Sequence, residues 1–146
     1  MLCENECVER RGVVKALKIF GVLVLVYVGI VVVFESLLGY FQPEGDYTMV
    51  ITTEDADGES KPRVLAKLES DGNLYAAANH WPRAWYHQAL ENPDVQVSIG
   101  ADTGAYTAVP ISGAEHARVD SEYPLGLGFR ILTGFPPRYF VRLDPQ

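Results

Sequence analysis

The feature that most constrains this chain is an uncharged apolar run near its N-terminus. Residues 19–34 carry no charged side chain. As a helix that rises about 1.5 Å per residue, residues 19–41 would cover roughly 34 Å, enough to cross a hydrocarbon core of about 30 Å. Lys18 can extend its amine to water at one end, and Tyr40 suits the interfacial belt at the other. The sequence therefore predicts one membrane-spanning helix, with residues 1–42 as tail and anchor.

A cleavable signal peptide is the main alternative for this run. Such a peptide needs small residues at a cleavage site after its apolar core. Residues 34–45 read FESLLGYFQPEG and offer no such site, so we expect the anchor to be retained. Four basic residues precede the run within residues 10–18, and none follows it before Lys61. This asymmetry predicts a cytoplasmic N-terminus and an extracytoplasmic domain.

Residues 43–146 are expected to form one acidic domain behind a turn-rich hinge at residues 42–46. The chain carries a formal net charge of -7, and the acidic excess lies after the apolar run. A field of that sign repels phosphate backbones, which argues against nucleic acid as a partner. The two cysteines, Cys3 and Cys7, precede the run, so the domain has no disulfide. Their spacing could serve lipidation or a metal, but no further ligand completes a set, and we expect unpaired thiols.

Period-two alternation and turn residues divide the domain into short strands. The clearest pair is a hairpin whose tight turn is Asp71-Gly72-Asn73. Six strands are predicted, at residues 47–53, 64–69, 74–78, 95–99, 106–111 and 138–143.

Two short helices interrupt these strands. The first covers residues 80–91, with Asn79 or His80 as its cap and Pro82 at its first position. The second covers residues 112–123 and starts with a capping box of Ser112 and Glu115. Six strands with two short helices indicate a small, mainly β barrel, in which a closed sheet leaves no exposed edge.

The most informative stretch for function is residues 74–93, LYAAANHWPRAWYHQALENP. Three alanines in a strand leave room for a flat ring, and the strand runs into a helix N-terminus, where free N–H groups favour an anion. Arg83 adds a cation there, and Trp81, Trp85 and Tyr86 supply aromatic walls. The stretch suits a phosphorylated heteroaromatic cofactor. The alternative is a helix that packs its two tryptophans into the core.

A second basic site comes just before the second strand. Lys61 and Arg63 flank Pro62 and could together hold a phosphate or carboxylate, or could be solvated charges on a strand edge. His80 and His87 lie seven residues apart, but no third ligand is spaced to complete a metal site, so none is expected.

The order of these elements resembles the deazaflavin-dependent nitroreductase family. The likeness covers residues 47–115 and the final strand, and its specific part is the pattern PxxWYxxxLxNP from Pro82 to Pro93. The resemblance implies a split β-barrel related to flavin-binding pyridoxamine-phosphate-oxidase-like proteins. It also implies an oxidoreductase that binds the deazaflavin F420 or a flavin such as FMN, and that reduces quinones or nitroaromatics by hydride transfer. Related barrels are often homodimers.

Carried over by position, the resemblance assigns the basic residues to the cofactor phosphate and the aromatic stretch to its ring. Lys61 and Arg63 would contact the phosphate, and residues 79–83, with Trp85 and Tyr86, would border the ring. The sequence departs from the family where a basic loop is replaced by the acidic residues 54–57. The residues of this cofactor site are then Lys61, Arg63, Asn79, His80, Trp81, Arg83, Trp85 and Tyr86.

Two functions follow from these observations. The first is a membrane-anchored oxidoreductase with a lipophilic acceptor such as a quinone, since the anchor holds the site beside the bilayer. The second is a non-catalytic, membrane-anchored barrel that binds a small ligand or a protein partner. The acidic loop and the predicted orientation, away from cytoplasmic reductants, favour the second.

Overall fold

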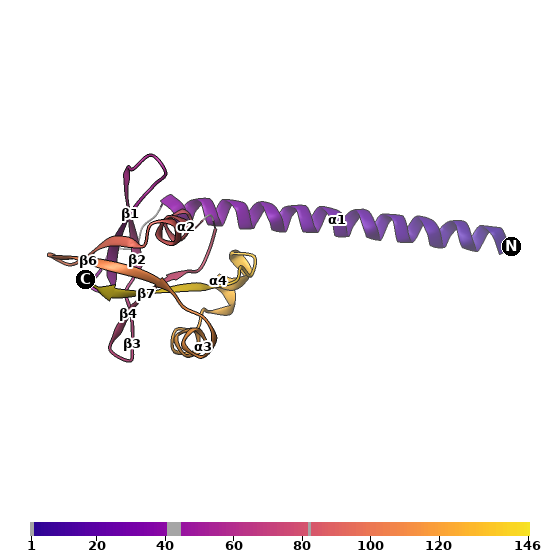
Figure 1. Cartoon of the computed structure of the whole chain (residues 1–146). Helices are drawn as coiled ribbons and strands as arrows, with labels where there is room; N and C mark the ends of the chain where they lie inside the picture. The colour runs from indigo at the N-terminus through magenta and orange to yellow at the C-terminus, as the bar shows by residue number, and fades with distance from the viewer. Residues whose placement is uncertain (1, 41–44, 82) are drawn as a thin grey trace.

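The N-terminal part of the molecule is one long helix that extends away from a small β domain (Figure 1). The computed structural model describes residues 2–40, 45–81 and 83–146. Helix α1 covers Leu2–Tyr40, and within it the stretch Gly12–Leu38 has a mean hydropathy of 2.7. This stretch is long and apolar enough to cross a membrane. Most of the predicted hinge at residues 42–46 lies outside the described residues.

The β domain is built on one curled antiparallel sheet of seven strands. Their order is β2-β1-β5-β6-β7-β4-β3, and each neighbouring pair is antiparallel. The strands are β1 (Thr48–Glu54), β2 (Ser60–Ala66), β3 (Leu68–Ser70), β4 (Asn73–Ala78), β5 (Asp94–Ile99), β6 (Asp102–Pro110) and β7 (Tyr139–Pro145).

The prediction of six strands was wrong by one, because the expected strand at residues 64–69 is two strands. β2 pairs with β1, whereas β3 pairs with β4 at the other end of the sheet order. Lys67 alone separates them, and its N–H donates to the carbonyl of Tyr47 at 2.9 Å. The chain therefore passes from one sheet edge to the other within a residue. This transfer curls the sheet into a half-barrel, as expected of a mainly β domain. The sheet is open, with β2 and β3 at the two ends of its order, so the expected closure without exposed edges is not observed within the described residues.

The apolar core lies on both faces of the sheet. One cluster lies beneath helix α2 (Ala84–Glu91), which buries Trp85, Tyr86 and Ala89 against β-strand residues such as Met49 and Val97. A second, smaller cluster of Leu68, Tyr75, Val119 and Phe140 lies beneath helix α3 (Gly113–Glu122). The side chains of alternate residues in β4 and β7 point to opposite faces of the sheet and pack into the two clusters, as the two-residue period of a strand requires. Helix α4 (Leu127–Leu132) lies beside α1 and had no sequence prediction.

Both predicted helices exist, but neither is capped as expected. α2 begins at Ala84, and its N-cap is Arg83 in a left-handed conformation, with φ at 59°. Neither Asn79 nor His80 caps it, and Pro82 lies outside the described residues. α3 has Ser112 at the N-cap, as expected, but without a side-chain capping hydrogen bond.

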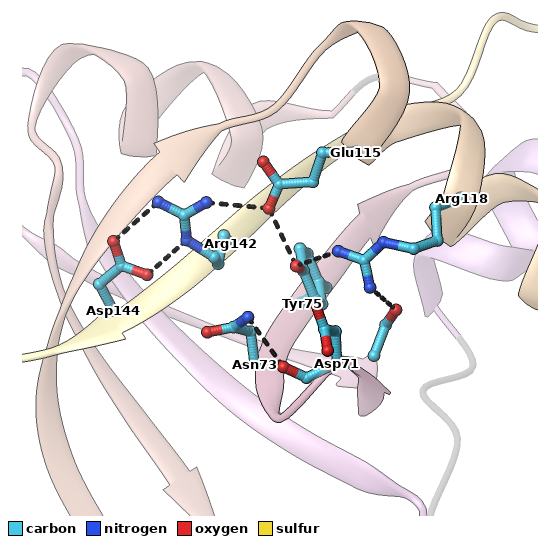
Figure 2. Close-up of polar contacts among 8 residues, drawn as sticks. Asp71, Asn73, Tyr75, Glu115, Arg118, Arg142 and Asp144 are labelled. Atoms are coloured by element: carbon cyan, nitrogen blue, oxygen red, sulfur yellow. Dashed lines mark hydrogen bonds and ion pairs between the residues drawn. The ribbon is translucent and has the colours of Figure 1, made fainter.

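The Glu115 side chain belongs to a polar network that ties α3 to the sheet rather than to a capping box (Figure 2). Its carboxylate lies 2.9 Å from Arg142 on β7 and accepts a hydrogen bond from the Tyr75 hydroxyl at 2.9 Å. Arg142 also contacts Asp144 at 2.6 Å. The Arg142 guanidinium holds the pKa of Glu115 and of Asp144 below their ordinary values. Arg118 completes the network with a bond to Tyr75 at 3.3 Å.

We expect Arg142→Met to destabilise the domain by roughly 1 kcal/mol at pH 7, a modest loss because the ion pairs are partly exposed. A carboxyl with a lowered folded pKa contributes stability above its unfolded pKa and loses it as pH falls through the folded pKa. The difference between wild type and variant should therefore shrink below about pH 4.5. Thermal melts from pH 7 to pH 3 measure it. Lys67→Met, which removes an exposed pair with Glu69, is the control and should show a smaller difference throughout.

Candidate functional site

A cavity of about 670 Å³ lies where the N-terminal helix meets the sheet. Its walls come from β2, the end of β4 with the two residues after it, the start of α2, and one residue each of α1 and α4. The lining residues are Leu38, Lys61, Pro62, Arg63, Val64, Leu65, Ala66, Ala77, Ala78, Asn79, His80, Arg83, Ala84, Trp85, Gln88 and Phe129.

Six of the eight residues expected at a cofactor site line this one cavity. They come from two separate stretches of sequence, around β2 and around the β4–α2 connection, and they are Lys61, Arg63, Asn79, His80, Arg83 and Trp85. The other two lie elsewhere. Trp81 is half exposed and covers Arg83, while Tyr86 is buried and stacks on Tyr139 with ring centroids 5.4 Å apart.

Arg83 is placed differently from the surface cation expected in the first turn of a helix. Only 4% of it is exposed, and its guanidinium lies between the rings of Trp81, at 4.3 Å, and Tyr139, at 4.8 Å. One guanidinium nitrogen donates to the carbonyl of Pro137. Its Nε has no hydrogen-bond partner within the described part of the chain. The left-handed backbone turns the side chain inward, so Arg83 stabilises the fold as well as lining the cavity.

Trp85 satisfies both interpretations of the aromatic stretch. It is buried in the cluster beneath α2, and it also lines the cavity. Its neighbours Ala77 and Ala78 present little side chain to the same space. A flat ring could therefore approach the β4 backbone beside an indole wall.

Lys61 lines the cavity, and its amine forms ion pairs with two carboxylates of the acidic loop. Its amine lies 2.6 Å from Glu59 and 3.1 Å from Asp55. The hydrogen bond to Glu59 is the main reason that the pKa of Lys61 is raised. The backbone N–H of Glu59 donates to Asp55, at 2.9 Å, and lowers the pKa of that carboxyl. An anionic ligand would have to compete with both carboxylates for this lysine.

The N-terminal helix reaches the cavity, which was not predicted from the sequence. Leu38 lines it directly, and Glu35 of the same helix lies 3.2 Å from Nδ1 of His80. The Glu35 side chain is only 11% exposed, and neither oxygen has a hydrogen-bond partner within the described residues. A charged residue that interrupts an apolar run was the available signal.

The cavity fits a phosphorylated aromatic cofactor in size and chemistry. Its volume lies in the range of about 300–1,000 Å³ that is usual for ligand pockets. The wall offers three cationic side chains, an indole and an alanine-lined strand, and the unpaired Nε of Arg83 could take an acceptor. Lys61 and Arg63 would hold the anionic part, and Ala78, Asn79 and Trp85 would border the ring.

Solved structures share this fold at low sequence identity. An F420-H2 dependent reductase, FDR-A, superimposes with a TM-score of 0.51 at 24% identity, over 65% of this chain and 93% of that one. A chain described as a domain-swapped dimer gives 0.56 at 18% identity, over 69% and 82%. HutZ, the heme storage protein of Vibrio cholerae, gives 0.53 at 16% identity, over 69% and 82%.

The sequence matches a family model from the later part of α1 through the end of α3. The family of F420H(2)-dependent quinone reductases matches residues 27–123 of the 146. The matched segment includes Glu35 and every residue that lines the cavity except Phe129. The chain belongs to the F420H(2)-dependent quinone reductase family.

Proposed function

We propose that this protein is a membrane-anchored oxidoreductase that uses the deazaflavin F420, or a flavin in its place, to reduce a quinone. The observation that carries the proposal is the cavity, because one space joins cationic side chains, an aromatic wall and a residue of the apolar helix. Residues 1–42 act as tail and anchor, and residues 43–146 as the catalytic domain. The flanking basic residues support an N-terminus in the cytoplasm and a domain outside it, which a reporter fused to the C-terminus would test.

In this proposal the bound cofactor supplies the hydride, and the protein supplies binding and orientation. Lys61 and Arg63 bind its phosphate, and the β4 alanines with Trp85 hold the ring flat against the strand. His80 lines the cavity and could give a proton to the reduced acceptor, and its Nδ1 lies 3.0 Å from the carbonyl oxygen of Trp81 and 3.2 Å from Glu35. The anchor keeps a lipid-soluble acceptor close to the site. A nitroaromatic could take the same place, and the dimeric neighbour supports a homodimer as the working assembly.

A titration of detergent-purified protein with F420 and with FMN tests the proposal. We expect wild type to bind at least one of them and Lys61→Ala to weaken binding about tenfold, the low end for a charge-assisted hydrogen bond at an exposed lysine. Glu59→Gln should strengthen binding, because it removes a carboxylate that competes for the Lys61 amine. Lys67→Ala is the matched control, since that lysine pairs with Glu69 and does not line the cavity.

The second function, a non-catalytic barrel that binds a ligand or partner, is favoured by the two carboxylates that neutralise Lys61. Failure of wild type to bind either cofactor at tens of micromolar would leave this function in place of the reductase. Binding that is unaffected in both Lys61→Ala and Glu59→Gln would contradict the phosphate assignment alone.

A further inference from the structure

Helix α4 and the loop after it expose an apolar surface beside the N-terminal helix. We name this surface the apolar ledge and define it by Leu127, Ile131, Leu132 and Phe135, whose exposed fractions are 68%, 42%, 37% and 50%. Four large apolar side chains within nine residues are an unusual exposure for a protein surface in contact with water alone. The sheet and α3 do not cover them.

The ledge is fixed against a defined part of α1. The Tyr27 hydroxyl donates to the carbonyl of Ile131 at 2.8 Å, and the rings of Phe34 and Phe129 meet edge to face with centroids 6.0 Å apart. Val31 lies so close to Gly134 that an added Cβ would come within 3.3 Å of it. α4 and the loop after it therefore lie alongside residues 27–34.

The length of the apolar helix decides how deep that part of α1 lies. Gly12–Leu38 has 27 residues and would extend about 40 Å, more than a hydrocarbon core of about 30 Å. Even with Gly12 at the cytoplasmic boundary, the core needs about 20 residues and reaches Val31. Tyr27 then lies about 6 Å inside the outer boundary, and any start closer to Lys18 places it deeper. Because Ile131 is hydrogen-bonded to Tyr27, α4 cannot stand clear of the bilayer.

The chemistry of α4 suits that depth. Its sequence, LGFRIL, contains no acidic residue, and three carbonyls near its C-terminal end accept hydrogen bonds from the backbone N–H groups of residues 133–135. The one charge, Arg130, lies over the Phe135 ring at 5.5 Å and can extend to the headgroups. The Thr133 hydroxyl donates a hydrogen bond to the carbonyl of Phe129 at 2.9 Å. Interfacial helices bury their apolar faces by about 5–10 Å, and the depth of about 6 Å that Tyr27 has with Gly12 at the boundary lies in that range.

We infer that the apolar ledge is a second membrane contact, which lies at the headgroup–acyl boundary of the leaflet where α1 leaves the bilayer. The inference rests on the proposed anchoring by α1. Phe129 of α4 and Leu38 of α1 both line the cavity, so the cavity borders the membrane at this contact. A lipophilic acceptor then enters sideways from the leaflet rather than through water.

Depth-dependent quenching tests the ledge in the full chain. Cys3 and Cys7 are replaced by Ser, and single cysteines are introduced as Leu127→Cys or Phe135→Cys and labelled with an environment-sensitive fluorophore. Leu23→Cys in the anchor and Ala101→Cys in the β5–β6 turn are the controls. Each protein is reconstituted into phosphatidylcholine vesicles that contain lipids with a spin-label quencher at a shallow or a deep acyl position.

We expect the labels at positions 127 and 135 to be quenched at least about twofold more than the label at Ala101, and more by the shallow quencher than by the deep one. The label at Leu23 should show the opposite depth preference. Labels at positions 127 and 135 that are quenched no more than Ala101, while Leu23 is quenched, would overturn the ledge and leave the anchor intact. An unquenched label at Leu23 would overturn the anchoring itself, and the inference with it.

Discussion

A chain that lacks residues 2–42 is expected to become fully extractable from membranes by alkaline carbonate and to keep its folded sheet. Every strand lies between Thr48 and Pro145, so the deletion removes the apolar helix without removing a strand. The domain should lose about 2–3 kcal/mol of stability, because the edge contact of Phe34 with Phe129 and the hydrogen bond from Tyr27 disappear. Alkaline carbonate extraction measures the redistribution, and circular dichroism measures the fold.

A shorter deletion of residues 2–26 is the matched control. It removes most of the apolar run but keeps Tyr27, Phe34 and the cavity residue Leu38. We expect it to be extractable by carbonate as well, while it melts close to the full chain. If the longer deletion unfolds the sheet under all conditions, α1 is part of the core and the division at residue 42 is wrong.

We expect Arg83→Ala to destabilise the domain by roughly 2–4 kcal/mol. It removes a charge-assisted hydrogen bond to Pro137 and a guanidinium held between two aromatic rings, in a buried setting where water cannot replace them. In a domain of about 100 residues, this loss lowers the melting temperature by roughly 8 °C or more. Thermal melts of detergent-purified protein measure the effect.

The variant Arg83→Gly distinguishes the contribution of the side chain to stability from the cost of the left-handed backbone. Arginine and alanine both bear the cost of the left-handed conformation at φ 59°, whereas glycine adopts it freely. We therefore expect the glycine variant to be more stable than the alanine variant by about 1 kcal/mol. Equal melting of wild type and Arg83→Ala would show that the buried guanidinium contributes nothing to the fold, and would return Arg83 to a purely ligand-binding role.

The sequence predicted what depends on local pattern. The apolar run required a long helix, and alternation placed β4 and β5 to within one residue, at Asn73–Ala78 and Asp94–Ile99. The break at Lys67 could not be predicted in the same way. No Gly or Pro marks it, and it exists because β2 and β3 pair with different strands at opposite ends of the sheet order.

The residues of the site were harder to place than the strands, because long-range contacts decide their surroundings. The buried Arg83 side chain contacts Tyr139 and Pro137, which lie far along the chain. Glu35 is buried because α1 packs on the domain, and no local pattern states where a helix will dock. α4 is a six-residue helix in a stretch rich in Gly and Pro, too short for a periodic signal.

The position of β7 sets the order in which this protein can be made. β7 lies between β6 and β4, yet it follows all other strands in the sequence, and it joins Leu74 to Leu143 across 69 residues. The sheet therefore cannot be completed until the ribosome has translated Tyr139–Pro145. α1 ends at Tyr40 and β7 begins at Tyr139, so the helix is translated long before the strand that completes the sheet. In the proposed anchoring, the helix would therefore enter the bilayer before the domain could fold.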